Sequence, residues 1–179
     1  MLFNRPFFEL ISKYEGQDEL LPERATKNSA GYDFIVAEDI VVPSYQKIFN
    51  SIQDIIQNPI SISDLSQLTK KYGCKPTLVP TGVKAFIPKC YYLQLSVRSS
   101  CPLKNWLILA NGVGVIDADY YNNPDNEGHI FFQLINLFPS DIQLKKGDKI
   151  GQGIFIPYVT TSTDKTTIDR VGGFGSTDK

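Results

Sequence analysis

The chain has 179 residues, of which 42% are hydrophobic and 21% are charged, and its formal net charge is −1. This length and composition indicate one soluble globular domain with a substantial core. The balanced charge argues against direct nucleic-acid binding, and no apolar run approaches the roughly 20 residues of a membrane span.

Short β-strands separated by turn residues account for most of the predicted structure. Gly, Pro or Asn residues bound the apolar runs, and Val83, Ala85 and Ile87 alternate along one of them. Many short strands of this kind are typical of an all-β sandwich, barrel or jelly roll. In chain order, the predicted strands cover residues 7–14, 32–37, 40–43, 78–87, 91–97, 106–110, 130–136 and 149–157.

One stretch, residues 45–74, has a helical period instead. Pro59 ends its first helix, and Ser61 is a candidate N-cap for the second, with Asp64 three residues later and Gly73 as the stop. We expect a helical hairpin inserted between two strands, with a structural role, packed against the barrel or an oligomer partner. The first helix is predicted from the spacing of Ile48, Phe49, Ile52, Ile55 and Ile56.

The cysteines and the single histidine point to structural roles. Cys74, Cys90 and Cys101 are odd in number and widely spaced, which fits neither a zinc site nor a disulfide framework. His129 has no Cys or His neighbour with which to share a metal. Residues 1–8 are too short and interrupted for a signal peptide, so we expect a reducing, cytoplasmic location.

The segment from Asn111 to Tyr120 carries the strongest candidate for catalysis. Its glycines allow a tight hairpin, and Asp117 follows two apolar residues that would hold its backbone on a rigid element. A carboxylate in such a position can act as a general base toward a water. An aspartate in a turn also commonly bonds nearby backbone, so this segment alone leaves both interpretations open.

Three other segments carry polar chemistry. Arg98, Ser99 and Ser100 combine a guanidinium with two hydroxyls, which suits phosphate, and Asp33 could reach a metal or a water bound to one. The Gly-rich tail, residues 170–179, has an arginine for phosphate and a phenyl ring for a base. Alone, each segment is equally explained as a strand end, a loop junction or a solvated terminus.

Taken together and in order, these segments resemble the five motifs of the trimeric dUTP pyrophosphatase (dUTPase) family. The resemblance covers nearly the whole chain outside the helical insert. It implies a distorted β-barrel or jelly roll over residues 1–165, followed by a C-terminal arm over residues 166–179 that closes over the active site. The matching segments are residues 29–33, 98–100, 111–120, 147–152 and 170–177.

The resemblance also implies an activity, which is the Mg²⁺-dependent hydrolysis of dUTP to dUMP and pyrophosphate. This reaction limits uracil incorporation into DNA and supplies dUMP for dTMP synthesis. By resemblance, Asp117 activates the water that attacks the α-phosphorus, and Tyr120 packs on the deoxyribose and excludes a 2′-hydroxyl. Asp33 would contact Mg²⁺ through water, and Asp148 would orient Arg98.

The family further implies a homotrimer in which each active site is shared between subunits. One subunit supplies the Asp117 segment, a second supplies the phosphate-binding motifs, and the third lends its C-terminal arm. Phe174 of that arm would stack on the uracil. The other substrate contacts implied by the resemblance come from Arg98, Ser99, Ser100, Asn111, Gly114, Ile116, Gln152, Arg170, Gly175, Ser176 and Thr177.

The chain departs from the family pattern at several points. Ser100 stands where the family usually has Gly, Val97 stands where it has Pro, and residues 121–129 contain an apparent insertion after Tyr120. A dCTP deaminase, which shares the fold, would need a catalytic Glu where this chain has Gln133. A nucleotide-responsive regulator that contacts a protein partner through an insert is a further alternative, which would add to the catalytic activity.

Overall fold

Twelve antiparallel strands form the body of the part of the chain that the structure describes. The structure is a computed structural model that describes residues 5–52, 59–72 and 75–167. Within them, no helix is long and apolar enough to cross a membrane. The strands are β1 (Phe7–Leu10), β2 (Glu23–Arg24), β3 (Tyr32–Ile35), β4 (Ile40–Val42), β5 (Thr77–Pro80), β6 (Val83–Phe86), β7 (Tyr91–Val97), β8 (Leu107–Leu109), β9 (Gly114–Ile116), β10 (Phe131–Asn136), β11 (Ile142–Leu144) and β12 (Lys149–Pro157).

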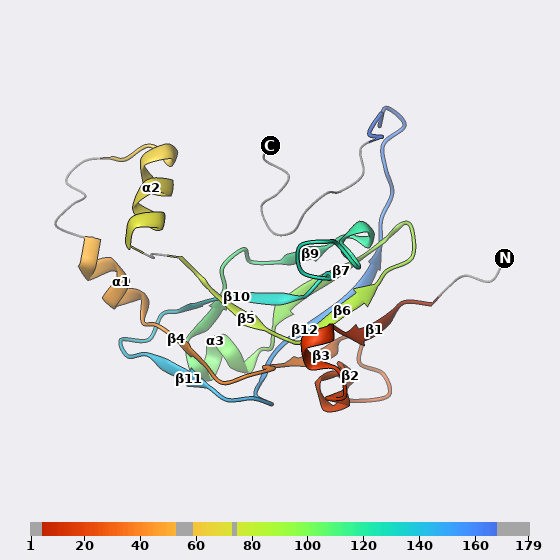
Figure 1. Cartoon of the computed structure of the whole chain (residues 1–179), viewed down its shortest axis with the longest axis horizontal. Helices are drawn as coiled ribbons and strands as arrows, with labels where there is room; N and C mark the ends of the chain where they lie inside the picture. Colours follow the sequence, from red (N-terminus) through yellow and green to blue (C-terminus); the bar gives the residue numbers. More distant parts are fainter. Residues whose placement is uncertain (1–4, 53–58, 73–74, 168–179) are drawn as a thin grey trace.

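The strands pair into a five-stranded sheet and three smaller ones (Figure 1). The large sheet has the order β2-β3-β12-β7-β9, and the others are β5-β10-β8, β1-β6 and β11-β4. Every pair between named strands is antiparallel. Together the sheets enclose one main core, so the expected all-β jelly-roll or barrel architecture is confirmed.

Two aromatic rings join the large sheet to the β5-β10-β8 sheet across the core. Phe34 and Phe132 are both fully buried, and their ring centroids lie 5.6 Å apart. Both rings occupy space that glycines on β12 leave open. A Cβ at Gly151 would lie 1.9 Å from Phe132 Cε1, and one at Gly153 would lie 2.8 Å from Phe34 Cε2. The glycines of β12 are therefore required by packing rather than by backbone conformation.

The predicted strand bounds are right for β7 and β12 and wrong where a turn interrupts an apolar run. Residues 78–87 form two strands, because the chain turns at Gly82, whose φ is +77°. Residues 7–14 form β1 and then a short 3₁₀ turn, η1 (Ser12–Tyr14). Strands β2, β9 and β11 and helix α3 (Ser100–Asn105) were not predicted.

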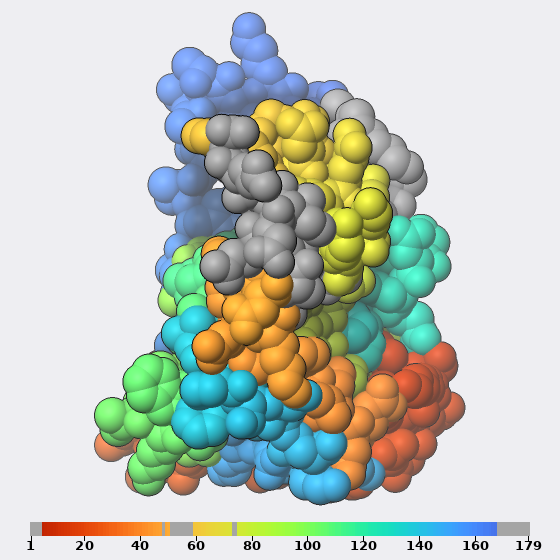
Figure 2. All heavy atoms as spheres, turned by 90° about the vertical axis from the view of Figure 1, so that its left-hand side faces the viewer, coloured from red at the N-terminus to blue at the C-terminus, as the bar shows by residue number. Residues whose placement is uncertain are grey.

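The insert contains the two predicted helices, α1 (Tyr45–Ile52) and α2 (Ile62–Tyr72). Ser61 caps α2 as expected: its Oγ accepts the Asp64 N–H at 3.2 Å and donates to Asp64 Oδ2 at 2.6 Å. Both helices stand at one side of the sheets (Figure 1), and they form the outer surface of that side in Figure 2. No residue of α2 is buried within the single chain, and the expected packing of the hairpin against the barrel or an oligomer partner stays a prediction.

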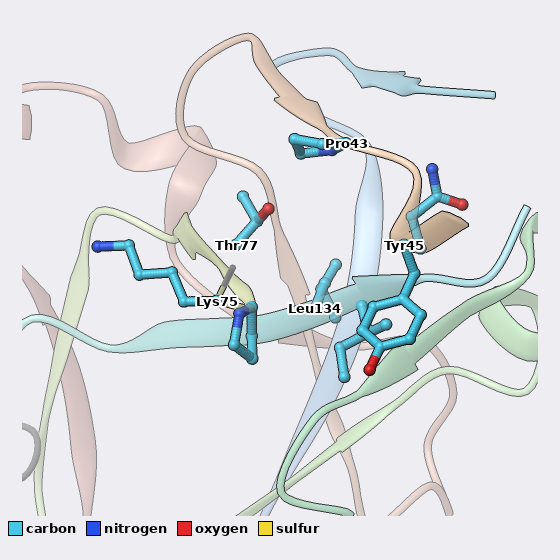
Figure 3. Close-up of a pocket in the computed structure, with 8 residues that line it drawn as sticks. Pro43, Tyr45, Lys75, Thr77 and Leu134 are labelled. Atoms are coloured by element: carbon cyan, nitrogen blue, oxygen red, sulfur yellow. The ribbon is translucent and has the colours of Figure 1, made fainter. Parts of the chain in front are cut away.

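The base of the insert is nevertheless attached firmly to the barrel. Ser44, which is fully buried, donates its N–H to Asp141 Oδ1 at 2.9 Å and its hydroxyl to the Phe138 carbonyl at 2.7 Å. Figure 3 shows the residues that line a small pocket at this junction. The pocket has a volume of about 40 Å³. Tyr45 and Lys75, from the two ends of the insert, line it together with Leu134 of β10.

Candidate active site

A carboxylate and two cations gather at the end of β7. Arg98 Nε lies 3.4 Å from Asp33 Oδ1, and Lys149 Nζ lies 2.9 Å from Asp33 Oδ2. The Asp33 side chain is only 12% exposed, whereas those of Arg98 and Lys149 are 35% and 49% exposed. The carboxylate therefore holds two cations whose remaining donors face solvent, which suits the binding of a phosphate chain.

Strand β12 places Gln152 within this cluster. Gln152 is opposite Asp33 on β3 and opposite Ser96 on β7, so its half-buried side chain belongs to the same end of the sheet. After β7 the chain is held to β12, because the Arg98 N–H donates to the Ile150 carbonyl at 3.3 Å. The sequence correctly grouped Asp33, Arg98 and Gln152 near one another, since these motifs lie on adjacent strands.

The residues that follow Arg98 turn into a short helix. Ser99 is exposed, and Ser100, which is half-buried, begins α3. The thiol of Cys101 lies 3.1 Å from the Ile150 carbonyl, and burial raises the pKa of this thiol above its ordinary value. The expected structural role of Cys101 agrees with this buried, protonated state.

Asp148 does not orient Arg98 in the described chain. Its Oδ2 accepts the Lys145 N–H at 2.8 Å and so closes the turn before β12. The carboxylate beside Arg98 belongs to Asp33, and its second cation, Lys149, was missed. Lys149 lies within a segment that resembles a family motif, but only the pairing of β3 with β12 reveals its contact with Asp33.

Asp117 lies at the other end of the large sheet. It directly follows β9, which pairs with β7 so that Ile116 is opposite Leu93. Its carbonyl accepts the Tyr120 N–H at 3.2 Å in the 3₁₀ turn η3 (Ala118–Tyr120). The half-buried Asp117 lines a hollow of about 580 Å³ together with Lys89, Asp119 and other residues. The backbone on both sides of this carboxylate is thus fixed by hydrogen bonds.

The hairpin before β9 borders a second, much smaller hollow. Asn111, Gly114 and Ile116 line it, and the exposed hairpin turns at Gly112, whose φ is +68°. Gln133 of β10 lines the same hollow. A carboxamide cannot act as a general base, so the deaminase alternative lacks its catalytic group here.

Tyr120 is buried in the main core, with 4% of its surface exposed. Its hydroxyl donates to the His129 carbonyl at 2.9 Å. His129 is itself buried and accepts the Gly82 N–H through Nε2 at 2.9 Å, which agrees with the structural role predicted for it. Burial lowers the pKa of His129 to about 4, so the ring is neutral near pH 7.

The two clusters lie toward different ends of β7. Asp117 extends β9 beside the beginning of β7, whereas Arg98 follows the last residue of β7. Leu93, which is opposite Ile116, stands five residues before Arg98, and five residues of extended strand span roughly 17 Å. A site that uses both clusters of one chain would have to span this distance.

Two expected parts of the site, a metal centre and the C-terminal arm, are not formed by the described residues. In the part of the chain that the structure describes, no group of three His, Cys, Asp or Glu residues is arranged to hold a metal. The tail residues Arg170, Phe174, Gly175, Ser176 and Thr177 lie outside the described residues.

A jelly roll with a cationic cluster at one strand end and a fixed carboxylate at the other defines an all-β protein suited to a small phosphorylated ligand. The dUTPase family model matches residues 61–178. The chain is 37% identical over 173 residues to a deoxyuridine 5'-triphosphate nucleotidohydrolase from Lactococcus lactis, with 95% of each chain covered. The chain belongs to the dUTPase family.

Solved structures are similar to the chain as well. A dUTPase from Streptococcus mutans has 38% sequence identity and a TM-score of 0.68, over 87% of this chain and 98% of that one. A mutant dUTPase from phage phi11 of S. aureus, described for its structural Mg(II) ion, has 20% identity and a TM-score of 0.59, over 92% and 98% of the two chains. This second likeness concerns the fold alone.

Proposed function

We propose that the chain is a dUTP diphosphatase, which hydrolyses dUTP to dUMP and pyrophosphate. The observation that supports this best is the position of Asp117, a half-buried carboxylate held between β9 and η3 at the edge of a large hollow. Membership of the dUTPase family supplies the substrate.

In the proposed reaction, Asp117 accepts a proton from a water as the water oxygen bonds to the α-phosphorus. The bond from that phosphorus to the bridging oxygen breaks, and pyrophosphate leaves with the electron pair. The protein contributes mainly position and charge in a transfer of this kind. Fixing the backbone on both sides of the carboxylate limits its movement, so that the water is held near its line of attack.

Arg98, Lys149 and Gln152 are the proposed phosphate-binding groups. The guanidinium and the ammonium are already held by Asp33, so little side-chain order has to be gained when the phosphates bind. Ser99 and Ser100 follow directly and could add donors. We expect Mg²⁺ to arrive bound to the triphosphate. Asp33 offers a single carboxylate, which would contact the ion through water, and the described residues include no group of three ligands that could hold the ion by themselves. Mg²⁺ would neutralise phosphate charge in the bound substrate.

We assign selection of the base to the hairpin that leads into β9, and selection of the sugar to the residues that follow β9. Backbone groups near Asn111 and Gly114 would pair with the uracil edge, and a cytosine would leave such groups without partners. Tyr120 is proposed to form the wall behind the deoxyribose. Because the structure buries its ring, any contact with the sugar would be made by the small exposed part of the residue.

We propose a homotrimer with shared sites, which the separation of the two clusters supports. One subunit would provide Asp117, a neighbour would provide Asp33, Arg98 and Gln152, and the arm over residues 166–179 of a third would cover the nucleotide. Phe174 would stack on the base, and Arg170, Gly175, Ser176 and Thr177 would close on the phosphates. The core over residues 1–165 would then be the folded domain.

The helical insert favours a second, additional function. Phe49, Ile62 and Leu65 are 49%, 88% and 49% exposed, which is unusual for large apolar side chains on adjacent helices. We propose that this hairpin contacts another protein chain, as a regulator would. Replacing residues 45–74 by a short linker should leave dUTP turnover and the trimer intact if that contact is separate from catalysis.

Pyrophosphate release from dUTP, dCTP, dTTP and UTP, with and without Mg²⁺, tests the main proposal. We expect turnover of dUTP alone, with strong dependence on Mg²⁺. Asp117→Asn should reduce turnover by about 10²- to 10⁴-fold and leave nucleotide binding largely unchanged, because the amide cannot accept the proton. Turnover of dCTP, or none of dUTP by the wild type, would overturn the assignment.

A further inference from the structure

The loop that follows Tyr120 is an ordered structure of its own. Within residues 121–129, the Asn122 N–H donates to the Glu127 carbonyl at 3.0 Å, and the Glu127 N–H donates to the Asn123 carbonyl at 2.9 Å. Asn123, at the centre of the loop, is buried. Its amide nitrogen donates to the Tyr120 carbonyl at 3.1 Å and to Asn126 Oδ1 at 2.8 Å. The loop therefore folds back on the tyrosine that precedes it.

Asn126 carries the contact with the Tyr120 side chain, and its neighbours fix the orientation of its amide. The Gly128 N–H donates to Asn126 Oδ1 at 3.1 Å, and a backbone N–H can only donate, so the amide oxygen must face Gly128. The amide nitrogen then faces the phenol, with Nδ2 lying 2.8 Å from Tyr120 Oη. The Tyr120 hydroxyl accepts this bond and gives its own proton to the His129 carbonyl. The Tyr120 hydroxyl thus both donates and accepts a hydrogen bond.

The same tyrosine holds the turn that contains Asp117. Its N–H donates to the Asp117 carbonyl at 3.2 Å and closes η3. Tyr120 is anchored in the core at one end by its hydroxyl and bonded to Asp117 at the other by its backbone. Any shift of the ring would move the N–H that fixes the Asp117 backbone, because the side chain is buried and closely packed.

The loop is also tied to the barrel on the side away from Tyr120. Glu127 accepts the Ser12 N–H at 3.1 Å, and Lys84 donates to Asn122 Oδ1 at 2.7 Å. Gly128 has a φ of +84°, and a Cβ there would lie 2.6 Å from the Tyr120 carbonyl oxygen, so the chain passes Tyr120 as closely as it can. These anchors order the outer side of the loop, whereas the contact with the phenol is made by Asn126 itself.

We propose that Asn126 is a positioning residue for catalysis: through the Tyr120 hydroxyl it fixes the turn that presents Asp117 to the attacking water. The inference rests on the proposed function of Asp117. It gives the insertion after Tyr120 a role, since that insertion brings the amide to the phenol.

Steady-state kinetics of Asn126→Ala with dUTP test this. The lost hydrogen bond should lower kcat about fivefold, with KM changed less than twofold, because the contact orients the base and does not touch the phosphates. Lys84→Met is the matched control, since it loosens the same loop at Asn122 without removing a partner of Tyr120. It should lower the melting temperature and leave kcat unchanged.

A double-variant cycle tests whether Asn126 affects kcat through the Tyr120 hydroxyl. In a Tyr120→Phe background, which lacks the hydroxyl, Asn126→Ala should cause no further loss of kcat. Unchanged kcat in the single variant, or losses that multiply in the double variant, would overturn the inference. If instead the wild type releases no pyrophosphate from dUTP, the proposed function is at fault, so the two failures are distinguishable.

Discussion

Gln152 lies directly against the backbone of Gly31, so closely that a Cβ at position 31 would be 2.5 Å from Gln152 Oε1. Gln152 is also opposite Asp33 in the β3–β12 pairing. The glycine before β3 thus leaves the space that the glutamine side chain occupies. This relationship connects two segments that are more than one hundred residues apart, and it leads to the first prediction.

Gly31→Ala should displace the Gln152 side chain and weaken phosphate binding. We expect a several-fold increase in KM for dUTP, consistent with loss of about 1 kcal/mol from one hydrogen bond, with little change in melting temperature. The measurement is steady-state kinetics of the wild type, Gly31→Ala, Gln152→Ala and the double variant. Because the alanine acts only through the glutamine, it should have no effect in the Gln152→Ala background, and an additive loss there would refute the assigned role.

Mixing two inactive variants should restore activity. Asp117→Asn lacks the base and Arg98→Ala lacks the phosphate-binding cation, but the two residues lie at opposite ends of β7. If each site combines Asp117 of one copy with Arg98 of another, co-refolded mixed oligomers contain some sites in which both are intact. Pyrophosphate release from dUTP should reappear in the mixture. Activity that stays absent in oligomers shown to be mixed would mean that the site lies within one chain.

Stability should fall on mild acidification because of His129. Burial lowers its folded-state pKa to about 4, below the ordinary value of 6.5, so the unfolded chain takes up a proton more readily between these values. The stabilisation is therefore complete above pH 6.5 and is lost as the pH falls toward 4, by about 2 kcal/mol between pH 7 and pH 5. Urea unfolding at both pH values, at one protein concentration, measures this loss.

His129→Gln is the control for the acid effect, because its amide oxygen can accept the Gly82 N–H without titrating. The variant should show a much smaller difference between pH 7 and pH 5. Equal losses in the two proteins would assign the acid sensitivity to other groups, and the lowered pKa of His129 would then have no consequence for stability.

Removing residues 170–179 should abolish most dUTP turnover without affecting the melting temperature. The described residues form a closed core that ends before this segment. The truncated protein should still form the same oligomer on size-exclusion chromatography. A fully active truncated protein would show that the arm has no part in catalysis, and a strongly destabilised one would place the segment within the fold.

Local patterns in the sequence predicted a large part of the fold. The bounds of β7 and β12 and the capping of α2 by Ser61 are right, because alternation and capping involve neighbouring residues. Strands β9 and β11 were missed, and each is held by the partner strand that lies beside it. The packing of the helical insert depends on non-local contacts, and α2 turned out to have no buried residue.

The same contrast between local patterns and non-local contacts applies to the candidate site. The order of the motifs, through their resemblance to the dUTPase family, led to Asp33, Arg98, Gln152 and Asp117, and the structure brings the first three together at one end of the sheet. Only the tertiary structure decided their partners: strand register brought Lys149 to Asp33, and left Asp148 to close its own turn. Ion pairs and side-chain hydrogen bonds join residues far apart in the chain, so their geometry depends on packing, which a linear pattern does not encode.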